Sequence, residues 1–306
     1  MGSNIKFVDK NTKDNGTQVG EYYTHPAFTF GDKELDGIWV GKFEMSHNTL
    51  SSSTTSNNLG CTSTTCTNAS GLRILPNVTS LRLNNISNMW YASRSMEQSN
   101  NVFGISNSDS HMMKNREWGA AAYLSHSKYG INTEIRINNN NACTTGCGAA
   151  TANASGSANC DNSYGTVTSY PQSTTGNISG IFDMSGGVYE YVMGNYGNTT
   201  SSSGFTADWF TSNSKYYDLY DSSIFTGNYS TNYSFCSLST CCGNALNETK
   251  NWYSDGANFV NSSTPWFYRG GYYLIASGAG AFYAADYNGI SVSIHSFRGV
   301  LAAKGA

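Results

Sequence analysis

The C-terminal segment, residues 266–301, restricts the possible folds of this chain more than any other part of the sequence. It opens with Arg269-Gly270-Gly271 and closes with Ser296-Phe297-Arg298. Between them, residues 272–295 are rich in Tyr, Ile, Ser, Ala, Gly and Asn and contain no Lys, Glu, Gln, Met or Trp. Gly and Asn favour turns, and aromatic and β-branched residues favour strands. We therefore predict strands and turns that close a sheet, and a surface suited to contacts rather than to catalysis, because Tyr, Ser, Gly and Asn dominate antibody binding loops.

The whole chain has the composition of a globular protein with unusually few charges. Its 306 residues suffice for a sizeable core, and 39% of them are apolar. Only 12% are charged, about half the usual share. The net charge of −3 provides no basic surface for nucleic acid. No apolar run reaches the length of a membrane span, and residues 1–20 are predicted to be a polar lead-in without an export signal.

Eight cysteines lie in polar segments, which favours disulfides in an oxidising, extracellular setting. The first expected pair joins Cys61 to Cys66. Free thiols and a zinc site are the alternatives, but no C-x-x-C pair is present, which disfavours zinc. The other candidates for disulfides are Cys143, Cys147, Cys160, Cys236, Cys241 and Cys242.

The N-terminal half predicts strands followed by two helices. Residues 21–47 alternate apolar and polar side chains around Gly turns, which indicates a pair of strands. Residues 78–98 predict a helix capped by Ser80 or Thr79. Its predicted buried face consists of Leu81, Ile86, Met89, Trp90 and Met96.

A second helix is predicted over residues 112–126, with Asn115 as its cap. Its predicted apolar stripe consists of Trp118, Ala121, Ala122 and Leu124.

Three inserts interrupt a single domain over residues 21–306. They lie near residues 48–76, 138–176 and 197–250, and are rich in Ser, Thr, Asn and Gly. Cysteines in the second insert favour a tethered excursion over a disordered segment. Aromatic residues in the third insert are expected to pack it onto the domain; they are Trp209, Tyr216, Tyr217 and Tyr220.

The C-terminal motifs carry a resemblance to a known family. The order R-G-G, then S-x-A-G-x-F from Ser277, then S-F-R resembles the variable region of proteins diversified by diversity-generating retroelements. Such proteins have a C-type-lectin-like fold of the formylglycine-generating-enzyme type. Their variable codons, altered at adenines, exclude the five residue types that are missing from residues 272–295. An ordinary terminal β segment remains the alternative.

The resemblance implies a hypervariable binding surface. Its expected contact residues are Tyr272, Tyr273, Leu274, Ile275, Gly278, Tyr283, Ala285, Asp286, Tyr287, Ile290, Val292, Ile294 and His295.

Three other segments resemble the same fold. Residues 37–44 are similar to its first core strand, Arg116-Glu117-Trp118 to its E-W helix, and residues 177–192 to its D-M-x-G-N-V-W-E-W segment. The implied architecture is α+β, with two helices and a twisted antiparallel sheet. The expected framework residues are Arg269, Arg298, Trp118 and Glu190, with Glu117 or Glu190 pairing the arginines.

Gly187 stands where the family has Asn, near a calcium site of its enzyme branch. This departure disfavours a metal and leaves Glu190 as a weak candidate ligand for structural calcium. A buried turn, stabilised by hydrogen bonds from Glu190 to the backbone, is the favoured interpretation.

The resemblance also raises catalysis, which the sequence disfavours. Formylglycine-generating enzymes use a cysteine pair shortly after R-G-G, but no cysteine follows Cys242 here. No histidine pair has metal-ligand spacing. We therefore expect no enzyme and no cofactor. We expect a protein displayed on a virion or bacterial surface that binds a macromolecule, chiefly protein, on a host or neighbouring cell. The alternatives are an undiversified adhesin or pilin-associated domain and, less favoured, a formylglycine-generating-type oxidase.

Overall fold

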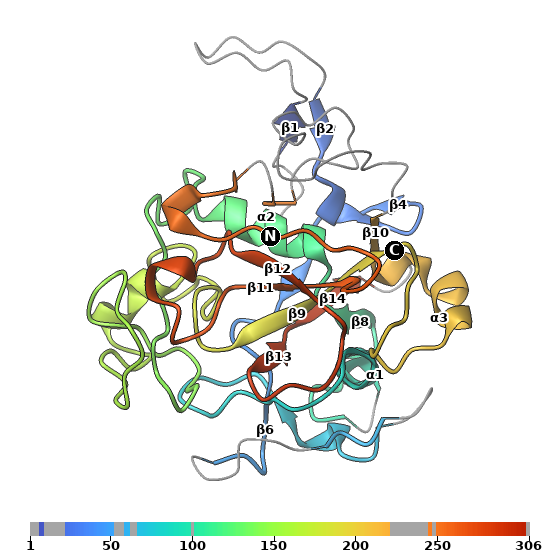
Figure 1. Cartoon of the computed structure of the whole chain (residues 1–306), viewed down its shortest axis with the longest axis horizontal. Coiled ribbons are helices and arrows are strands. Elements are labelled where there is room, and N and C mark those ends of the chain that lie inside the picture. Colours follow the sequence, from blue (N-terminus) through green and yellow to red (C-terminus); the bar gives the residue numbers. More distant parts are fainter. Residues whose placement is uncertain are drawn as a thin grey trace.

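The chain forms a mixed α+β structure with few, short helices and several mostly antiparallel sheets (Figure 1). The computed structural model describes residues 6–8, 22–51, 58–61, 66–98, 101–220, 244–246 and 249–303. The helices of these ranges are α1 Ile86–Arg94, α2 Asn115–Leu124 and α3 Ala207–Ser212. The strands are β1 Lys6–Val8, β2 Tyr22–Thr24, β3 Thr29–Phe30, β4 Lys33–Glu34, β5 Trp39–Val40, β6 Ser46–His47, β7 Leu72–Arg73, β8 Ser108–Met112, β9 Tyr189–Tyr196, β10 Asp218–Tyr220, β11 Trp266–Arg269, β12 Ala284–Tyr287, β13 His295–Phe297 and β14 Gly299–Ala303.

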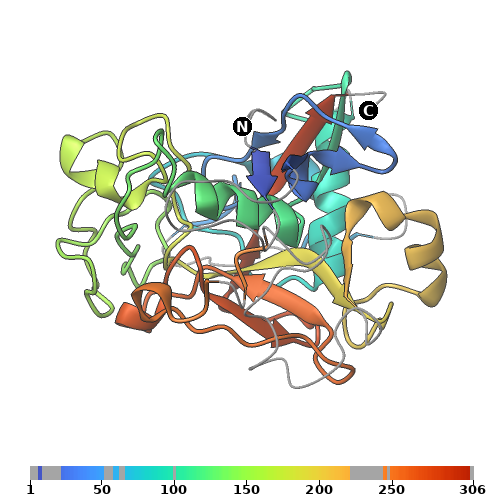
Figure 2. The ribbon, with the colours of Figure 1, turned by 90° about the horizontal axis from the view of Figure 1, so that it is seen from above.

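The largest sheet is organised around β9. Strands β10 and β13 pair with β9 in parallel, and β11 pairs with it antiparallel and carries β12 at its other edge. The chain then passes through Arg298 into β14, the centre of the antiparallel sheet β5-β14-β8. The C-terminal segment therefore joins the two largest sheets. Seen from above, β11 and β12 lie along the lower side of the molecule, whereas β14 lies near its upper side, close to the C-terminus (Figure 2).

The first predicted helix is present but shorter than expected. Helix α1 begins at Ile86 because Asn85, with extended backbone, accepts a hydrogen bond from the Asn88 amide at 3.0 Å. Ser80 and Thr79 were therefore the wrong caps, since both lie in β-bridges upstream of the helix. All five residues predicted for its buried face are buried.

The second predicted helix begins at Asn115, one residue after its cap. The backbone amide of Lys114 donates to the Glu117 carboxylate at 2.8 Å, which satisfies the first turn. Asn115 is therefore not the cap; its side chain donates to the Tyr220 hydroxyl at 2.6 Å. Of the predicted stripe, Leu124 alone is not fully buried.

The predicted core strand over residues 37–44 is largely absent. Of these residues only Trp39 and Val40 form a strand, at the edge of the sheet, and Trp39 is 78% exposed. Phe43 and Glu44 lie in irregular backbone, but their side chains are buried in the core. The Glu44 carboxylate accepts a hydrogen bond from the Val188 amide at 3.1 Å.

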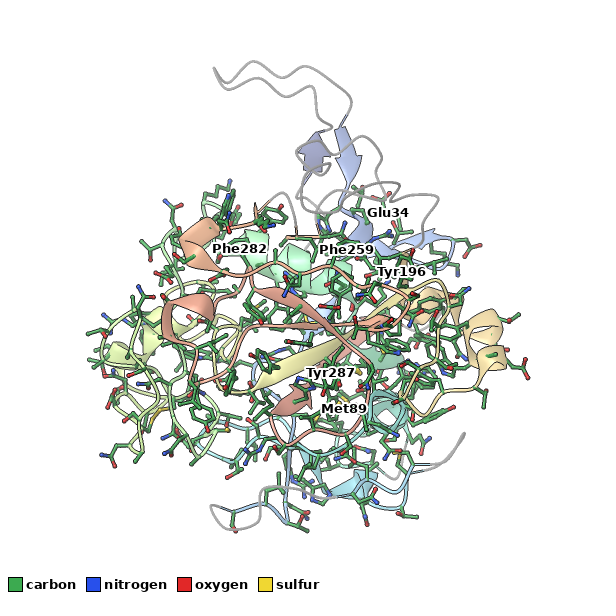
Figure 3. The ribbon with its side chains drawn as sticks, in the orientation of Figure 1. Glu34, Met89, Tyr196, Phe259, Phe282 and Tyr287 are labelled. Atoms are coloured by element: carbon green, nitrogen blue, oxygen red, sulfur yellow. A yellow bond between two sulfur atoms is a disulfide. The ribbon has the colours of Figure 1, made fainter. Side chains whose placement is uncertain are left out.

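Side chains from helices, strands and inserts fill one main core (Figure 3). The aromatic residues of the third insert that were expected to pack onto the domain are all buried, which confirms that expectation. The second insert forms loops at one end of the molecule (Figure 1). A small apolar cluster joins it to the C-terminal segment, since Ala149 of the insert packs with Ile137 and Ala279.

Two disulfides are present in the described ranges. Cys61–Cys66 confirms the first expected pair, and Cys147–Cys160 tethers the second insert. Cys143 was a candidate for a disulfide, and this prediction is wrong, because Cys143 is a buried free thiol. The remaining candidates, Cys236, Cys241 and Cys242, lie outside the described residues. Disulfides of this kind are typical of oxidising compartments.

No helix within the described ranges combines the length and the apolar character needed to traverse a bilayer.

Candidate ligand-binding surface

One face of the largest sheet carries a continuous group of aromatic side chains. Side chains alternate between the two faces of a strand, so Tyr189 and Tyr191 of β9 share a face. Tyr268 of β11 lies opposite Tyr191, and His295 of β13 lies beside Tyr189. The loops around β12 add further tyrosines. We define the tyrosine face as Tyr189, Tyr268, Tyr272, Tyr283, Tyr287 and His295.

The rings of the tyrosine face pack against one another. Tyr189 is at the centre, with its ring centroid 4.5 Å from Tyr268, 4.8 Å from Tyr272 and 5.8 Å from Tyr283. His295 lies 4.9 Å from Tyr268 and 5.5 Å from Tyr287. Aromatic pairs at these separations stabilise each other by about 0.5–1.5 kcal/mol beyond their burial. The face is therefore a fixed platform and not a set of independent side chains.

Most of the thirteen predicted contact residues are accessible. Leu274, Tyr287 and Ile290 are 53%, 37% and 43% exposed. The half-buried ones are Tyr272, Tyr273, Ile275, Gly278, Tyr283, Asp286, Val292 and Ile294. The other two, Ala285 and His295, are buried and lie beneath the surface.

Asp286 and His295 have structural surroundings that limit their direct use in contacts. The Asp286 carboxylate accepts hydrogen bonds from Asn261 and Thr264, across the turn before β11. His295 is 3% exposed, and burial lowers its pKa to about 3, so the ring is neutral at physiological pH. It supports the tyrosines above it.

The two tyrosines that β9 and β11 supply to the tyrosine face, Tyr189 and Tyr268, are uncharged. Burial and the neighbouring hydroxyls of Tyr283 and Tyr268 raise the pKa of Tyr189, so its phenol stays protonated. Tyr268 behaves in the same way, because burial and Tyr283 raise its pKa. A neutral, amphipathic platform can contact apolar and hydrogen-bonding groups alike.

Arg298 fixes the end of the segment. It is fully buried, and its Nε and Nη2 atoms donate to Glu190 at 3.1 and 2.5 Å. It also donates to the backbone oxygens of Gly41 at 2.7 Å and Phe182 at 3.0 Å. The predicted pairing of a framework arginine with Glu190 is thus confirmed for Arg298. Both carboxylate oxygens of Glu190 accept hydrogen bonds from the Arg298 guanidinium. The expectation that Glu190 stabilises a turn through hydrogen bonds to the backbone is therefore wrong.

The other framework residues have different partners from those predicted. Arg269 donates to the Asn115 side chain at 3.2 Å and to the backbone oxygens of Asn244 at 3.3 Å and Ala245 at 2.7 Å. Glu117 instead contacts the His111 ring at 2.9 Å. Trp118 is fully buried, and its indole N–H donates to the backbone oxygen of residue 281 at 2.8 Å, which holds the loop before Tyr283.

Glu190 does not have the surroundings of a calcium ligand. In the ranges that the structure describes, no group of three or more His, Cys, Asp or Glu side chains could hold a metal ion. The nearby carboxylates of Glu44 and Asp183 accept hydrogen bonds from protein donors: the Val188 amide at 3.1 Å and the Gly146 amide at 2.8 Å. Burial is the main cause that raises the pKa of both groups.

Asp255 anchors the loop that leads to Tyr283. Its Oδ2 accepts a hydrogen bond from the Phe282 amide at 3.0 Å, whereas its buried Oδ1 has no partner. Burial raises the pKa of Asp255 to about 7, against the lowering effect of the Phe282 amide.

This anchor predicts a pH dependence. An acid with a raised folded-state pKa contributes stability below its unfolded pKa and loses that contribution as pH rises through the folded value. We expect the wild-type free energy of unfolding to fall between about pH 4 and 7 relative to that of Asp255→Asn, by at least about 1 kcal/mol. Urea unfolding across this range measures the difference. A constant difference would contradict the assignment.

Sequence reasoning missed two residues of the tyrosine face, Tyr189 and Tyr268. Both lie outside the segment with the restricted composition. The available signal was strand alternation: Tyr189 and Tyr191 flank the buried Glu190, and Tyr268 precedes the framework Arg269 by one residue. Alternation places each tyrosine on the opposite face from its charged neighbour.

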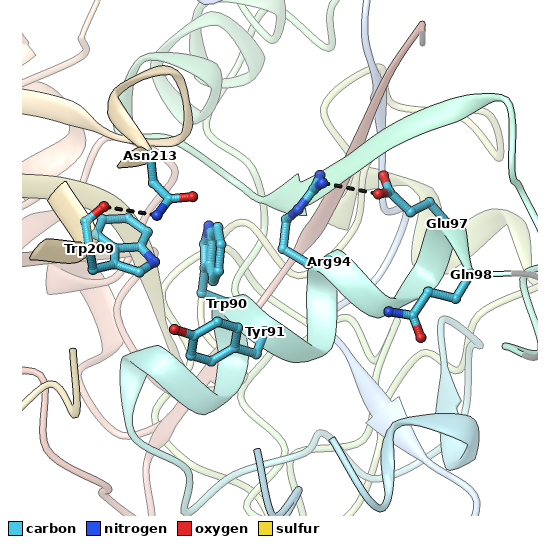
Figure 4. Close-up of a pocket in the computed structure, with 7 residues that line it drawn as sticks. All are labelled: Trp90, Tyr91, Arg94, Glu97, Gln98, Trp209 and Asn213. Carbon is cyan, nitrogen blue, oxygen red and sulfur yellow. Dashed lines mark hydrogen bonds and ion pairs between the residues drawn. The ribbon is translucent and has the colours of Figure 1, made fainter. Parts of the chain in front are cut away.

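A separate pocket of about 280 Å³ lies between α1 and α3 (Figure 4). Its lining residues are Trp90, Tyr91, Arg94, Glu97, Gln98, Trp209 and Asn213. Arg94 pairs with Glu97 at 3.0 Å and with Asp109, so its charge is already compensated. The two indole rings meet edge to face at 5.0 Å. The polar groups of this pocket thus largely serve the packing of α1 against α3.

No protein-family model matches this sequence, and no curated protein has significant similarity to it.

Proposed function

We propose that this chain is a ligand-binding protein with a C-type-lectin-like fold of the formylglycine-generating-enzyme type, whose surface a retroelement diversifies. Its ligand is a macromolecule, chiefly protein, on a host or neighbouring cell. One observation carries the proposal: residues 272–295 supply the exposed side chains around the tyrosine face, whereas the flanking Arg269 and Arg298 are fully buried. Variation at most of the expected positions would then change side chains that contribute little to the core; Ala285 and His295, which are buried, are the exceptions.

The chemistry of the surface supports binding. Leu274, Tyr287 and Ile290 are exposed apolar side chains next to neutral tyrosines. Exposed apolar groups gathered in one region mark interaction sites, and Tyr is among the residues that contribute most to binding energy. The ring packing around Tyr189 lowers the entropy cost of ordering the surface on binding.

The cysteines support display outside the cell rather than catalysis. Four of them form the two disulfides described above, which fits a virion or bacterial surface. Burial raises the pKa of the free thiol Cys143 to about 12, so it is not a ready nucleophile. An undiversified adhesin or pilin-associated domain remains the competing account.

Substitution of exposed positions is expected to leave the fold intact. Leu274→Ser and Ile290→Ser should each change the free energy of unfolding by about 0.5 kcal/mol or less, because they contribute little to the core. Tyr287→Ser should cost about 1 kcal/mol, because it also loses ring contacts with Tyr268 and His295. The control Phe297→Ser, at a fully buried position nearby, should be far more damaging. Urea unfolding compares the four variants. Comparable losses at the three exposed positions would contradict the proposal.

A display library tests binding itself. Positions 272–275, 287 and 290 are randomised on phage and selected against a panel of unrelated proteins. A control library randomises exposed positions of the second insert, such as Thr151, Ser155 and Asn159. We expect specific binders from the first library at clearly higher frequency. Equal yields from the two libraries would show that residues 272–295 are no better suited to recognition than any other surface.

A further inference from the structure

A small polar pocket on the side of α2 away from the second insert has an unusual charge distribution. It has a volume of about 230 Å³ and opens where β3, the start of α2 and β10 meet. Its lining residues are Thr29, Gly31, Lys114, Arg116, Ser214, Lys215, Tyr217 and Asp218. Three of these carry positive charge and one carries negative charge. It shares no residue with the tyrosine face.

Lys114 is the feature of this pocket that needs an explanation. Its side chain is buried, with the residue only 4% exposed, yet its ammonium donates only to the backbone oxygen of Thr29, at 3.3 Å. Its other described contact is with the face of the Phe30 ring, at 5.3 Å. An ammonium has three donors, and burying a charge without a counter-charge is costly. Among the described residues, no carboxylate forms an ion pair with it.

The carboxylates nearby are engaged by other groups. Glu117 accepts from the His111 ring and from the Lys114 backbone amide. Asp218 accepts from the Arg116 amide at 2.7 Å and lies 3.7 Å from the Arg116 guanidinium.

The third cation of the pocket is also compensated. Lys215 pairs at 2.7 Å with Asp109, which also binds Arg94. Lys114 is therefore the one charged side chain lining this pocket that forms no ion pair with a described residue; the Glu117 carboxylate attracts its ammonium without pairing with it.

We propose that this pocket binds a tetrahedral oxyanion, phosphate or sulfate, with Lys114 as its principal contact and Lys215 and Arg116 at its rim. An oxyanion supplies the missing counter-charge and several acceptors for the free ammonium donors. The exposed Ser214 adds a hydroxyl donor at the entrance. Because the pocket is open to solvent, the oxyanion can be free or esterified to a larger molecule.

The test measures thermal unfolding of the whole chain in sodium phosphate and in sodium chloride at equal ionic strength. We expect phosphate, at about ten times its Kd, to raise Tm by about 3 °C over chloride. The increase should be lost in Lys114→Met, which keeps the apolar stem but removes the charge. It should persist in Lys128→Met, which removes an exposed lysine elsewhere.

Parallel titrations distinguish the sources of the oxyanion. Sodium sulfate tests whether the charge geometry alone suffices, and O-phosphoserine tests an esterified group. If Lys114→Met does not fold, Lys215→Met provides the second variant, with affinity for phosphate expected to fall about tenfold. The absence of any phosphate effect beyond chloride, or an equal effect in the Lys114 or Lys215 variant and in wild type, would overturn the proposal.

Discussion

Replacing Arg298 with Met is expected to lower the free energy of unfolding by about 3–5 kcal/mol, because it leaves the buried Glu190 carboxylate without its partner. Arg298 also donates to the backbone oxygens of Gly41 and Phe182, so the substitution leaves two acceptors unsatisfied as well. Since Arg298 connects β13 to β14, the loss affects both large sheets.

Two further variants separate the ion pair from simple loss of volume. Arg298→Met combined with Glu190→Gln removes both charges and should recover part of the loss. Lys128→Met, which removes an exposed charge, should cost about 0.5 kcal/mol or less. Urea unfolding followed by circular dichroism measures all three. A loss below about 1 kcal/mol for Arg298→Met alone would show that the arginine is not a framework residue.

Gly187→Asn, which introduces the residue that the resembling family has at this place, is expected to destabilise the chain by about 1–3 kcal/mol. The backbone of Gly187 has φ of +69°, a left-handed conformation that Asn tolerates better than most residues, so backbone strain contributes only a small part of the expected loss. A Cβ built at this position lies 2.6 Å from Oε1 of the buried Glu44. Relief of that clash requires movement in a packed core, at about 1–3 kcal/mol.

A double-mutant cycle identifies the cause. If contact with Glu44 is the main penalty, Gly187→Asn should cost much less in a Glu44→Ala background than in wild type. If the penalty is the same in both backgrounds, backbone conformation alone is responsible. A fully neutral Gly187→Asn would contradict the described geometry and would reopen the calcium site of the family's enzyme branch.

Local sequence patterns predicted the features that depend on neighbouring residues. The pair Cys61–Cys66 lies within one short loop. The burial of Met89 and Trp90 follows from helical periodicity, and the exposure of Leu274 and Ile290 agrees with a segment specialised for contacts. In each case the signal and its consequence lie within a few residues of each other.

Features that depend on distant parts of the chain were not predictable in the same way. Ser80 has the chemistry of a helix cap, but its hydroxyl donates to Glu44 instead. Glu117 was a reasonable partner for an arginine, but His111, on the neighbouring strand β8, binds it. Tyr189 belongs to the tyrosine face because β9 pairs with both β11 and β13. Such pairings between segments far apart in sequence are set by the tertiary fold.

The central claim, that residues 272–295 form a surface which varies on a fixed framework, is tested most directly by deep sequencing of the 3′ end of this gene in a growing population, with a search of the adjacent DNA for a near-copy. We predict adenine-restricted variation confined to codons 272–295, concentrated at exposed positions such as Leu274, Tyr287 and Ile290, with Arg269 and Arg298 unchanged. A uniform sequence without a near-copy would contradict the account and leave a fixed surface adhesin in its place.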